Sequence, residues 1–212
     1  MKSPVRKRGR RSSPSRSKNP IDGIGSTKLF SRGEKVFRKG QAARHIYRVE
    51  FGCIRTFLNV GDGRRLGGAF YFPGDYFGLD MREMHSFSAE AVTPSMVRLI
   101  GRKALASLIA SDIAVAKQLL HITNVELQRA QSHSLILRSS ADERVANFLF
   151  EMKKRNRSRE VDLLMSRQDI ADHLNLTIES VSRAFARLKK ASVISFLTHR
   201  RVAVHLRKPL AA

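Results

Sequence analysis

The spacing of apolar residues changes once along this chain, near Gly101, and that change most constrains the fold. From Leu29 to about Ile100, segments such as HIYRVEFGCIRTFLNV and RLGGAFYF alternate apolar and polar residues between glycines. Short alternating strands with frequent turn signals are typical of an antiparallel barrel or roll. The stretch NVGDG at 59–63 predicts a hairpin turn, because Gly, Asn and Asp tolerate a positive φ.

After Gly101 the pattern becomes helical, with apolar or small residues at alternating steps of three and four. These positions are Ile113, Ala116, Leu120, Thr123, Leu127, Ala130, Ser134 and Leu137. They form a heptad seam, which favours a helix over 109–138. The seam has two interpretations: it pairs with its twin in a homodimer through Ile113, Leu120, Leu127 and Leu137, or it packs against its own domain.

The segment MSRQDIADHLNLTIESVSRAFARLKK, at 165–190, predicts two short helices. Ser166 and Asp169 have the spacing of a capping box, Asn175 can end the first helix in the left-handed conformation, and Thr177 can cap the second. The apolar stripe of the second helix consists of Val181, Ala184, Phe185 and Leu188. Two short helices joined by about three residues are typical of a helix-turn-helix.

The opposite face of the second helix carries side chains suited to base edges. Arg183 can donate two hydrogen bonds to guanine, and Glu179 can accept one from the cytosine amine. Ser182, beside them, can form a hydrogen bond or contact a thymine methyl group. The competing interpretation is a solvated face on which Glu179 and Arg183 pair with each other. After a capped helix and a turn, we expect base contacts.

The segment VISFLTHRRVAVHL, at 193–206, predicts two strands joined by a turn with His199, Arg200 and Arg201 at its tip. A hairpin with a basic tip after a recognition helix is typical of a wing that touches phosphates. The alternative is a plain hairpin that closes the domain.

The formal charge of the chain is +22, which favours a polyanionic partner. Residues 1–20 hold eight basic and no acidic side chains, with few large apolar ones. We therefore expect a disordered basic tail over 1–22. Three roles are open for it: an arm that attracts phosphates, a solvated tail without a role, or a targeting segment.

Several classes of function lack the residues that they need. No apolar run is long enough to span a membrane and no secretory signal is visible, so we expect a cytoplasmic protein with no membrane partner. Cys53, the single cysteine, cannot form an intramolecular disulfide, and we expect it to be buried in a strand. The seven histidines have no metal-ligand spacing, and neither a phosphate loop nor a nucleophile elbow is present. We expect no metal site and no enzyme.

The order of these segments resembles the Crp/Fnr family of bacterial transcription regulators, and within it the FixK-like branch. The resemblance begins after Ile24 and rests on GEKVFRKGQAARHIYRVEFGCIRTFLNVGDGRRLGGAFYFPGDYFGL and on the segment at 165–190. It implies an α+β fold. The parts are an antiparallel β-roll of cyclic-nucleotide-binding type at 23–108, a long dimerisation helix at 109–138 and a winged helix-turn-helix at 139–212.

The family pattern E-x-x-S-R matches Glu179, Ser182 and Arg183, and implies base contacts to a TTGAT-type half-site. A homodimer would bind such half-sites in double-stranded DNA as an inverted repeat. The same matching makes Arg167 and Gln168 phosphate contacts, to which we add the residues Thr177 and Arg200. The resemblance further implies RNA polymerase as a partner and activation of microaerobic or nitrogen-fixation genes.

Two departures from the family pattern bear on cofactors. Members that bind cyclic AMP carry an Arg-Ser pair, but here His85 precedes Ser86, and imidazole lacks the bidentate fork of a guanidinium group. Oxygen-sensing members carry an N-terminal cluster of cysteines that this chain lacks. We therefore expect no cyclic nucleotide, no iron–sulfur cluster and no haem. The alternative function is a sensor in which a small molecule or haem in the roll controls DNA binding, with His85 as the first candidate ligand.

Overall fold

The computed structural model of the chain describes residues 20–60, 65–80 and 82–206. Its N-terminal strands are β1 (Ser26–Phe30), β2 (Lys35–Phe37), β3 (His45–Phe51), β4 (Ile54–Asn59), β5 (Arg65–Tyr71), β6 (Tyr76–Phe77), β7 (Ser88–Ala91) and β8 (Ser95–Gly101). They form two four-stranded antiparallel sheets, in the orders β1-β8-β3-β6 and β2-β7-β4-β5. The two sheets confirm the predicted β-roll.

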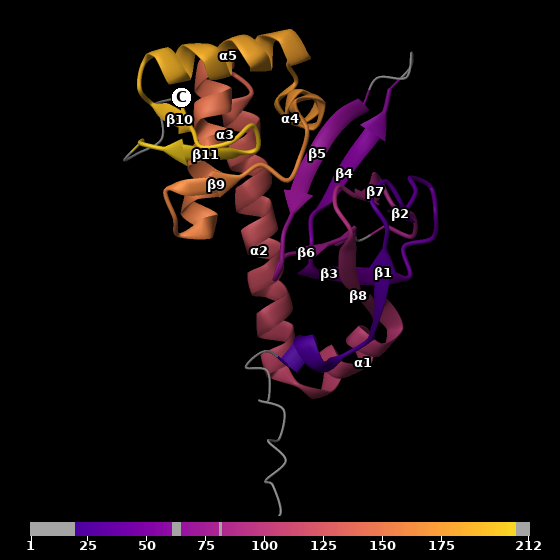
Figure 1. The fold of residues 1–212 in the computed structure, drawn as a ribbon. Helices are drawn as coiled ribbons and strands as arrows, with labels where there is room; N and C mark the ends of the chain where they lie inside the picture. The colour runs from indigo at the N-terminus through magenta and orange to yellow at the C-terminus, as the bar shows by residue number, and fades with distance from the viewer. Residues whose placement is uncertain (1–19, 61–64, 81, 207–212) are drawn as a thin grey trace, which may run out of the picture.

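Helices and a small sheet make up the rest of the fold. These elements are η1 (Pro20–Gly23), α1 (Arg102–Ser111), α2 (Ile113–Ile136), α3 (Ala141–Asn156), β9 (Glu160–Asp162), α4 (Arg167–Leu174), α5 (Ile178–Lys190), β10 (Ile194–Phe196) and β11 (Arg201–Val204). In Figure 1, α2 runs beside the roll, from α1 at one end to the helical domain at the other. Among the described residues, no helix has the length and apolar character needed to cross a membrane.

The hairpin predicted from NVGDG is present, because β4 and β5 are antiparallel neighbours with Asn59 opposite Arg65. Residues 61–64 of the turn lie outside the described residues. The apolar inner faces of the strands pack between the two sheets, in a cluster that includes Phe37, Tyr47 and Phe77.

The predicted tail extends too far. Residues 1–19 lie outside the described residues, but residues 20–23 form η1, and Ile21 is 0% exposed. Its side chain packs with Ile46 and Ile100, and its backbone N–H donates to Gln118 Oε1 at 3.1 Å. A single isoleucine between Pro20 and Asp22 gives no periodic signal, so the sequence pattern placed it in the tail.

The predicted start of the long helix at residue 109 falls inside α1, a helix that was not predicted as a separate element. The chain bends at Asp112, whose side chain accepts a hydrogen bond from the Ala114 N–H and caps α2. The helix itself ends at Ile136, and Leu137 is its C-terminal cap residue.

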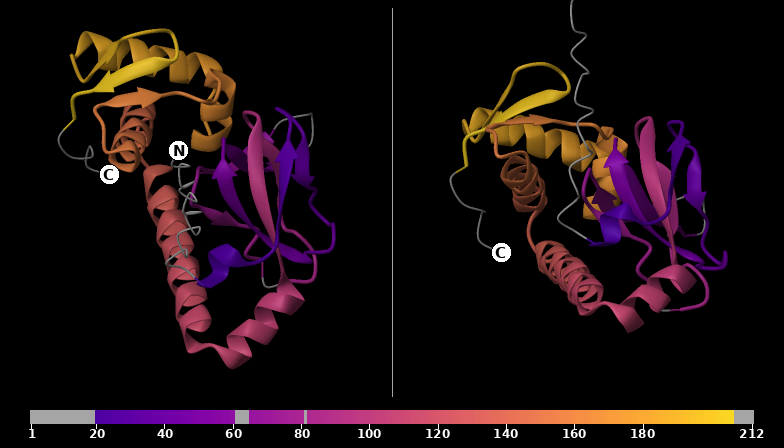
Figure 2. Two further views of the ribbon diagram at one scale, coloured as in Figure 1. Left: turned by 60° about the horizontal axis from the view of Figure 1, so that its bottom comes forward. Right: turned by 90° about the horizontal axis from the view of Figure 1, so that it is seen from below.

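The core of the C-terminal domain continues into the roll. Its helices and wing contribute most of the buried side chains, and Cys53, Phe70 and Val92 from the roll belong to the same cluster. Figure 2 shows α4 on the side of the helical domain that faces the strands. The roll and the C-terminal domain are therefore packed together rather than joined only through α2.

Candidate nucleic-acid interface

The ends of α4 are set by its own side chains. Ser166 accepts from the Asp169 N–H at 3.1 Å, and Asp169 Oδ2 accepts from the Ser166 N–H at 2.8 Å, which completes the predicted capping box. Asn175 ends the helix in the left-handed region with φ of 51°, as predicted. Arg144 of α3 also donates to the carbonyl oxygens of Leu174 and Asn175, at 3.1 and 3.3 Å. This contribution of α3 was not predicted.

The second helix, α5, is oriented by its apolar stripe. Thr177 caps it by accepting from the Ser180 N–H at 3.2 Å. The predicted stripe is buried in the core: Val181, Ala184, Phe185 and Leu188. At the far end, Arg187 forms two hydrogen bonds of 2.6 Å with the Asp142 carboxylate on α3. Because the stripe faces inward, the opposite side of α5 must face solvent.

That opposite side carries the three predicted base contacts, and all of them are exposed. The Ser182 hydroxyl donates to the Ile178 carbonyl at 2.8 Å, and Arg183 reaches only the Ser180 hydroxyl, at 3.5 Å. The pKa of Glu179 is lowered chiefly by its own backbone N–H, then by the Thr177 hydroxyl, with a smaller effect of Arg183. Glu179 and Arg183 form no ion pair within the described chain, so the face of α5 is open rather than self-paired.

Three of the four predicted phosphate contacts are exposed. Gln168 lies at the start of α4 and donates to Asp172 at 2.7 Å, while Thr177 lies at the start of α5. Arg200 is exposed at the tip between β10 and β11. Polar groups at the N-termini of helices and at a wing tip are well placed for DNA phosphates.

Arg167 has a different environment. Its guanidinium carbon lies 3.3 Å from the centre of the Phe185 ring, and Nη1 is buried without a hydrogen-bond partner among the described residues. Desolvation lowers the pKa of Arg167 from 12.5 to about 10, so the side chain stays charged at neutral pH. The stack fixes α4 against α5, a packing role that the sequence pattern did not indicate.

The wing has one more strand than predicted. In the order β10-β11-β9, the additional strand β9 comes from the segment after α3, for which no strand was predicted. Arg201, predicted at the tip, instead donates from Nε to Asp162 Oδ1 at 2.7 Å. Arg201 is exposed like His199 and Arg200, but its guanidinium group is paired with Asp162.

The long helix α2 has two distinct apolar faces. Val115, Leu119 and Ile122 pack with α1 and the roll. Three of the four large heptad residues point away from it: Ile113 and Leu120 are each 71% exposed and Leu127 is 55% exposed. Leu137, the fourth, is half-buried, as is Ala116. The helix therefore packs on its own domain with one face and still presents the seam to solvent.

Inside the roll, His85 is buried in an aromatic cluster. Its ring stacks on Phe37 with centroids 3.7 Å apart, and its Nδ1 lies 3.2 Å from Asp80 Oδ2. In the part of the chain that the structure describes, Nε2 has no hydrogen-bond partner. Cys53 is buried as predicted, but it lies in the connection between β3 and β4 rather than in a strand. Desolvation raises its pKa to about 12, which is far from a reactive thiolate. Among the described residues, no group of three or more metal-ligating side chains occurs.

Comparisons with known proteins agree with this architecture. Residues 27–112 match a cyclic nucleotide-binding domain, and residues 143–212 match a Crp-like helix-turn-helix domain. The chain is 40% identical to the nitrogen fixation regulation protein FixK of Azorhizobium caulinodans over 90% of this chain and 79% of that protein. It is 35% identical to the FixK protein of Rhizobium meliloti over 83% and 81%. Its fold is similar to the structure of FixK2 from Bradyrhizobium japonicum, with a TM-score of 0.82 and 37% identity over 87% of this chain and 94% of that one.

Proposed function

The chain belongs to the Crp/Fnr family of bacterial transcription regulators, in its FixK-like branch, and from that membership we propose that it binds a TTGAT-type inverted repeat as a homodimer. It is a DNA-binding regulator and not an enzyme. The single observation that carries the proposal is the open face of α5, where Glu179, Ser182 and Arg183 are exposed together above a buried stripe. Their donors and acceptors suit guanine, cytosine and thymine edges in the major groove.

The exposed seam of α2 supports the homodimer. Leu120 and Leu127 lie one heptad apart on a face that the roll does not cover. Large apolar side chains at such spacing are stabilised when a second helix covers them. A two-fold dimer also explains an inverted repeat, because each recognition helix would meet one half-site.

The names of the relatives support the genes that we propose as targets. The FixK proteins of Azorhizobium caulinodans and Rhizobium meliloti are nitrogen fixation regulation proteins. We propose that this chain likewise activates microaerobic or nitrogen-fixation genes, with RNA polymerase as its partner on the promoter. Its place of action would be the bacterial cytoplasm, where the chromosome lies.

The inside of the roll does not fit a cyclic nucleotide. His85 stands where cyclic-AMP-binding members carry an arginine, and its neighbour Asp80 would repel a cyclic phosphate. The ring of His85 is also stacked directly on Phe37. We therefore propose that DNA binding needs no cofactor.

One observation favours the sensor alternative. His85 Nε2 is buried with no hydrogen-bond partner among residues 20–60, 65–80 and 82–206, and a carboxylate on Nδ1 is the arrangement that orients a ligating imidazole. A haem or small molecule that engaged Nε2 would make DNA binding depend on that ligand.

The deciding experiment measures binding of the purified, ligand-free protein to a TTGAT–ATCAA duplex and to a scrambled duplex by fluorescence anisotropy. Specific binding without any addition, by a protein with no visible absorbance, supports the proposal. Binding only after addition of haem or another ligand would favour the sensor, and equal binding to both duplexes would refute sequence-specific recognition.

The dimer is tested by Leu120→Asp, which places a charge in the seam. We expect a monomer in sedimentation and loss of binding to the inverted repeat, while unfolding stays cooperative, which would show that each protomer remains folded. Asn124→Asp, on the same helix outside the seam, is the matched control. A dimeric Leu120→Asp variant would contradict the assignment of this face.

A further inference from the structure

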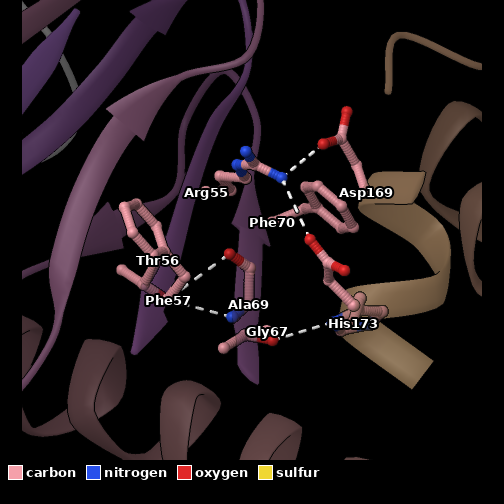
Figure 3. A pocket seen from close by; sticks show the side chains of 10 residues that line it. Arg55, Thr56, Phe57, Gly67, Ala69, Phe70, Asp169 and His173 are labelled. Carbon is pink, nitrogen blue, oxygen red and sulfur yellow. Dashed lines mark hydrogen bonds and ion pairs between the residues drawn. The ribbon is translucent and has the colours of Figure 1, made fainter. Parts of the chain in front are cut away.

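The outer face of the β4–β5 hairpin holds α4 through an ion-pair bridge. Arg55 on β4 donates from Nη1 to Asp169 Oδ1, and the same nitrogen lies 3.8 Å from Asp172 Oδ2. Arg55, Asp169 and Asp172 are only 13–15% exposed at their side chains. Figure 3 shows the guanidinium group between the strands and the helix, with dashed lines to the carboxylates. Partly buried pairs of this kind are stronger and more specific in geometry than exposed ones.

Arg55 is itself held by the roll. Its Nε donates to Glu90 Oε1 at 2.8 Å, and Glu90 is buried on β7. Glu90 also accepts from Lys35 and from Arg65, the latter at 2.8 Å. The Arg55 guanidinium group is therefore held in a fixed position on the sheet. Removing it leaves Glu90 paired with two other cations, Lys35 and Arg65.

The second contact is a close approach of backbone to backbone. A Cβ atom at Gly67 on β5 would lie 2.5 Å from His173 Cα on α4, so only glycine fits there. Beside it, His173 Nδ1–H donates to the Gly68 carbonyl at 2.7 Å. The His173 ring stacks on His133 of α2, with centroids 4.4 Å apart. Strand, long helix and α4 thus meet at one point.

The turn after β5 fastens the neighbouring helices to the same hairpin. Asp75 accepts from Arg129 of α2 at 3.1 Å and from Arg155 of α3 at 2.7 Å. The Phe70 ring lies 6.2 Å from that of Phe148 on α3 and joins the core of the C-terminal domain. The β4–β5 hairpin is therefore a platform for α2, α3 and α4 together.

The platform restricts the orientation of the recognition helices in the proposed dimer. The two helices of such a dimer must lie about one turn of DNA, roughly 34 Å, apart and in a fixed orientation. The link between α2 and α3 is only residues 137–140 and would let the C-terminal domain swing. Docking of α4 on the hairpin removes this rotational freedom of the C-terminal domain before the dimer binds DNA.

Resting on the proposed function, we infer that Arg55, Gly67 and His173 are positioning residues for DNA recognition, which fix the orientation of α5 and thereby set the half-site spacing that the dimer accepts. All three lie at the contact between the roll and α4, and none belongs to the exposed face of α5. They act by keeping the binding-competent orientation populated, because apparent affinity falls with the fraction of molecules in that state.

The test compares Arg55→Ala and Gly67→Ala with wild type on three kinds of duplex: the full inverted repeat, a single half-site, and repeats whose spacer is changed by about one base pair. One base pair turns one half-site by roughly a tenth of a turn. Gly101→Ala is the matched control, because an added Cβ there meets no atom within 4 Å. Thermal unfolding and sedimentation are the control measurements that establish whether each variant is a folded dimer.

We expect Arg55→Ala to lose about tenfold in affinity for the full repeat if docking drops to a tenth of the population. Half-site binding should be unchanged, and the preference for one spacer length should weaken. Gly67→Ala should act in the same direction, and the double variant should lose less than the product of the two effects, because both remove one docking event.

Equal losses on the half-site and the full repeat, or an unchanged spacer preference in both variants, would overturn the inference. A merely structural defect lowers the active fraction and moves all duplexes equally, so it cannot imitate the expected pattern. If wild type itself fails to distinguish the inverted repeat from scrambled DNA, the proposed function fails, and that result is separate from any behaviour of the variants. Should Gly67→Ala not fold, Arg55→Ala alone decides, since Glu90 keeps Lys35 and Arg65.

Discussion

The junction between the roll and α4 differs from the exposed face of α5 in the partners of its charges. At the junction Arg55 binds Glu90 of the roll and Asp169 of α4. On α5, Arg183 reaches only the Ser180 hydroxyl at 3.5 Å and has no carboxylate partner within the described chain. Two arginines near the same helix-turn-helix thus have different roles.

This comparison distinguishes the charges that stabilise the fold from those that stay available to bind a ligand. A paired, partly buried charge fixes geometry, since breaking the pair leaves an unneutralised group in a poorly solvated place. An exposed guanidinium group without an ion-pair partner gives up little solvation when it meets a base or phosphate. The following changes separate these two roles.

The largest effect should come from Phe185, which lies under the open face. Phe185→Ala removes a buried ring and the stack on Arg167, and should lower the free energy of unfolding by about 3–5 kcal/mol. Urea unfolding at constant pH measures the loss. An exposed neighbour on the same helix, Ala186→Ser, is the control, and similar losses in both variants would mean that α5 is not held by its stripe.

Arg183→Ala should act on affinity instead of stability. We expect a loss of about 1–3 kcal/mol on the TTGAT-type site, with little change on random DNA, because a bidentate base contact is removed. Anisotropy titrations at fixed salt concentration measure both. A loss of equal size on random DNA would show that Arg183 contacts phosphate.

Acidification should loosen the junction. Desolvation, with a smaller effect of His133, lowers the pKa of His173 from 6.5 to about 3. Between these two pH values the imidazole of the unfolded chain is protonated, whereas that of the folded chain stays neutral. Stability from this group is complete above pH 6.5 and is lost as the pH falls toward 3, by about 2 kcal/mol at pH 5. Urea unfolding at pH 7.5 and 5 tests this expectation. His173→Gln should flatten the pH dependence, whereas the same change at the exposed His199 should leave it intact.

The smallest effect should come from the cap of α4. Ser166→Ala removes one half of the capping box and should cost about 1 kcal/mol of stability. The Asp169 N–H would lose its acceptor, but the Asp169 carboxylate would keep both the backbone N–H of residue 166 and Arg55, so the hairpin should continue to hold the helix. If Ser166→Ala lowers the free energy of unfolding by clearly more than about 1 kcal/mol in the same urea assay, the cap of α4 and the Arg55–Asp169 ion pair depend on each other.

Much of the helix-turn-helix was predictable because its signals are local. Ser166, Asn175 and Thr177 each act on groups within four residues of themselves, and the stripe from Val181 to Leu188 follows from the helical period. The roll was recognisable for a similar reason, since alternation within each strand shows which side chains point inward. Ile21 and β9 were missed, because one apolar residue or a three-residue strand shows no period. The helix α1 was missed as a separate element, because the break at Asp112 depends on packing and not on the helical period.

The residue pattern by itself determined the kinds of elements, their caps and the face of α5 that stays open. Only the tertiary structure decided that Arg55 meets Asp169, 114 positions away, that α4 approaches Gly67 closely enough to exclude a side chain, and that Arg167 stacks on Phe185. The physical reason is that caps and periodicity depend on neighbours along the chain. An ion pair between two domains depends instead on how complete helices and strands pack against one another. The local sequence pattern contains no information on that packing.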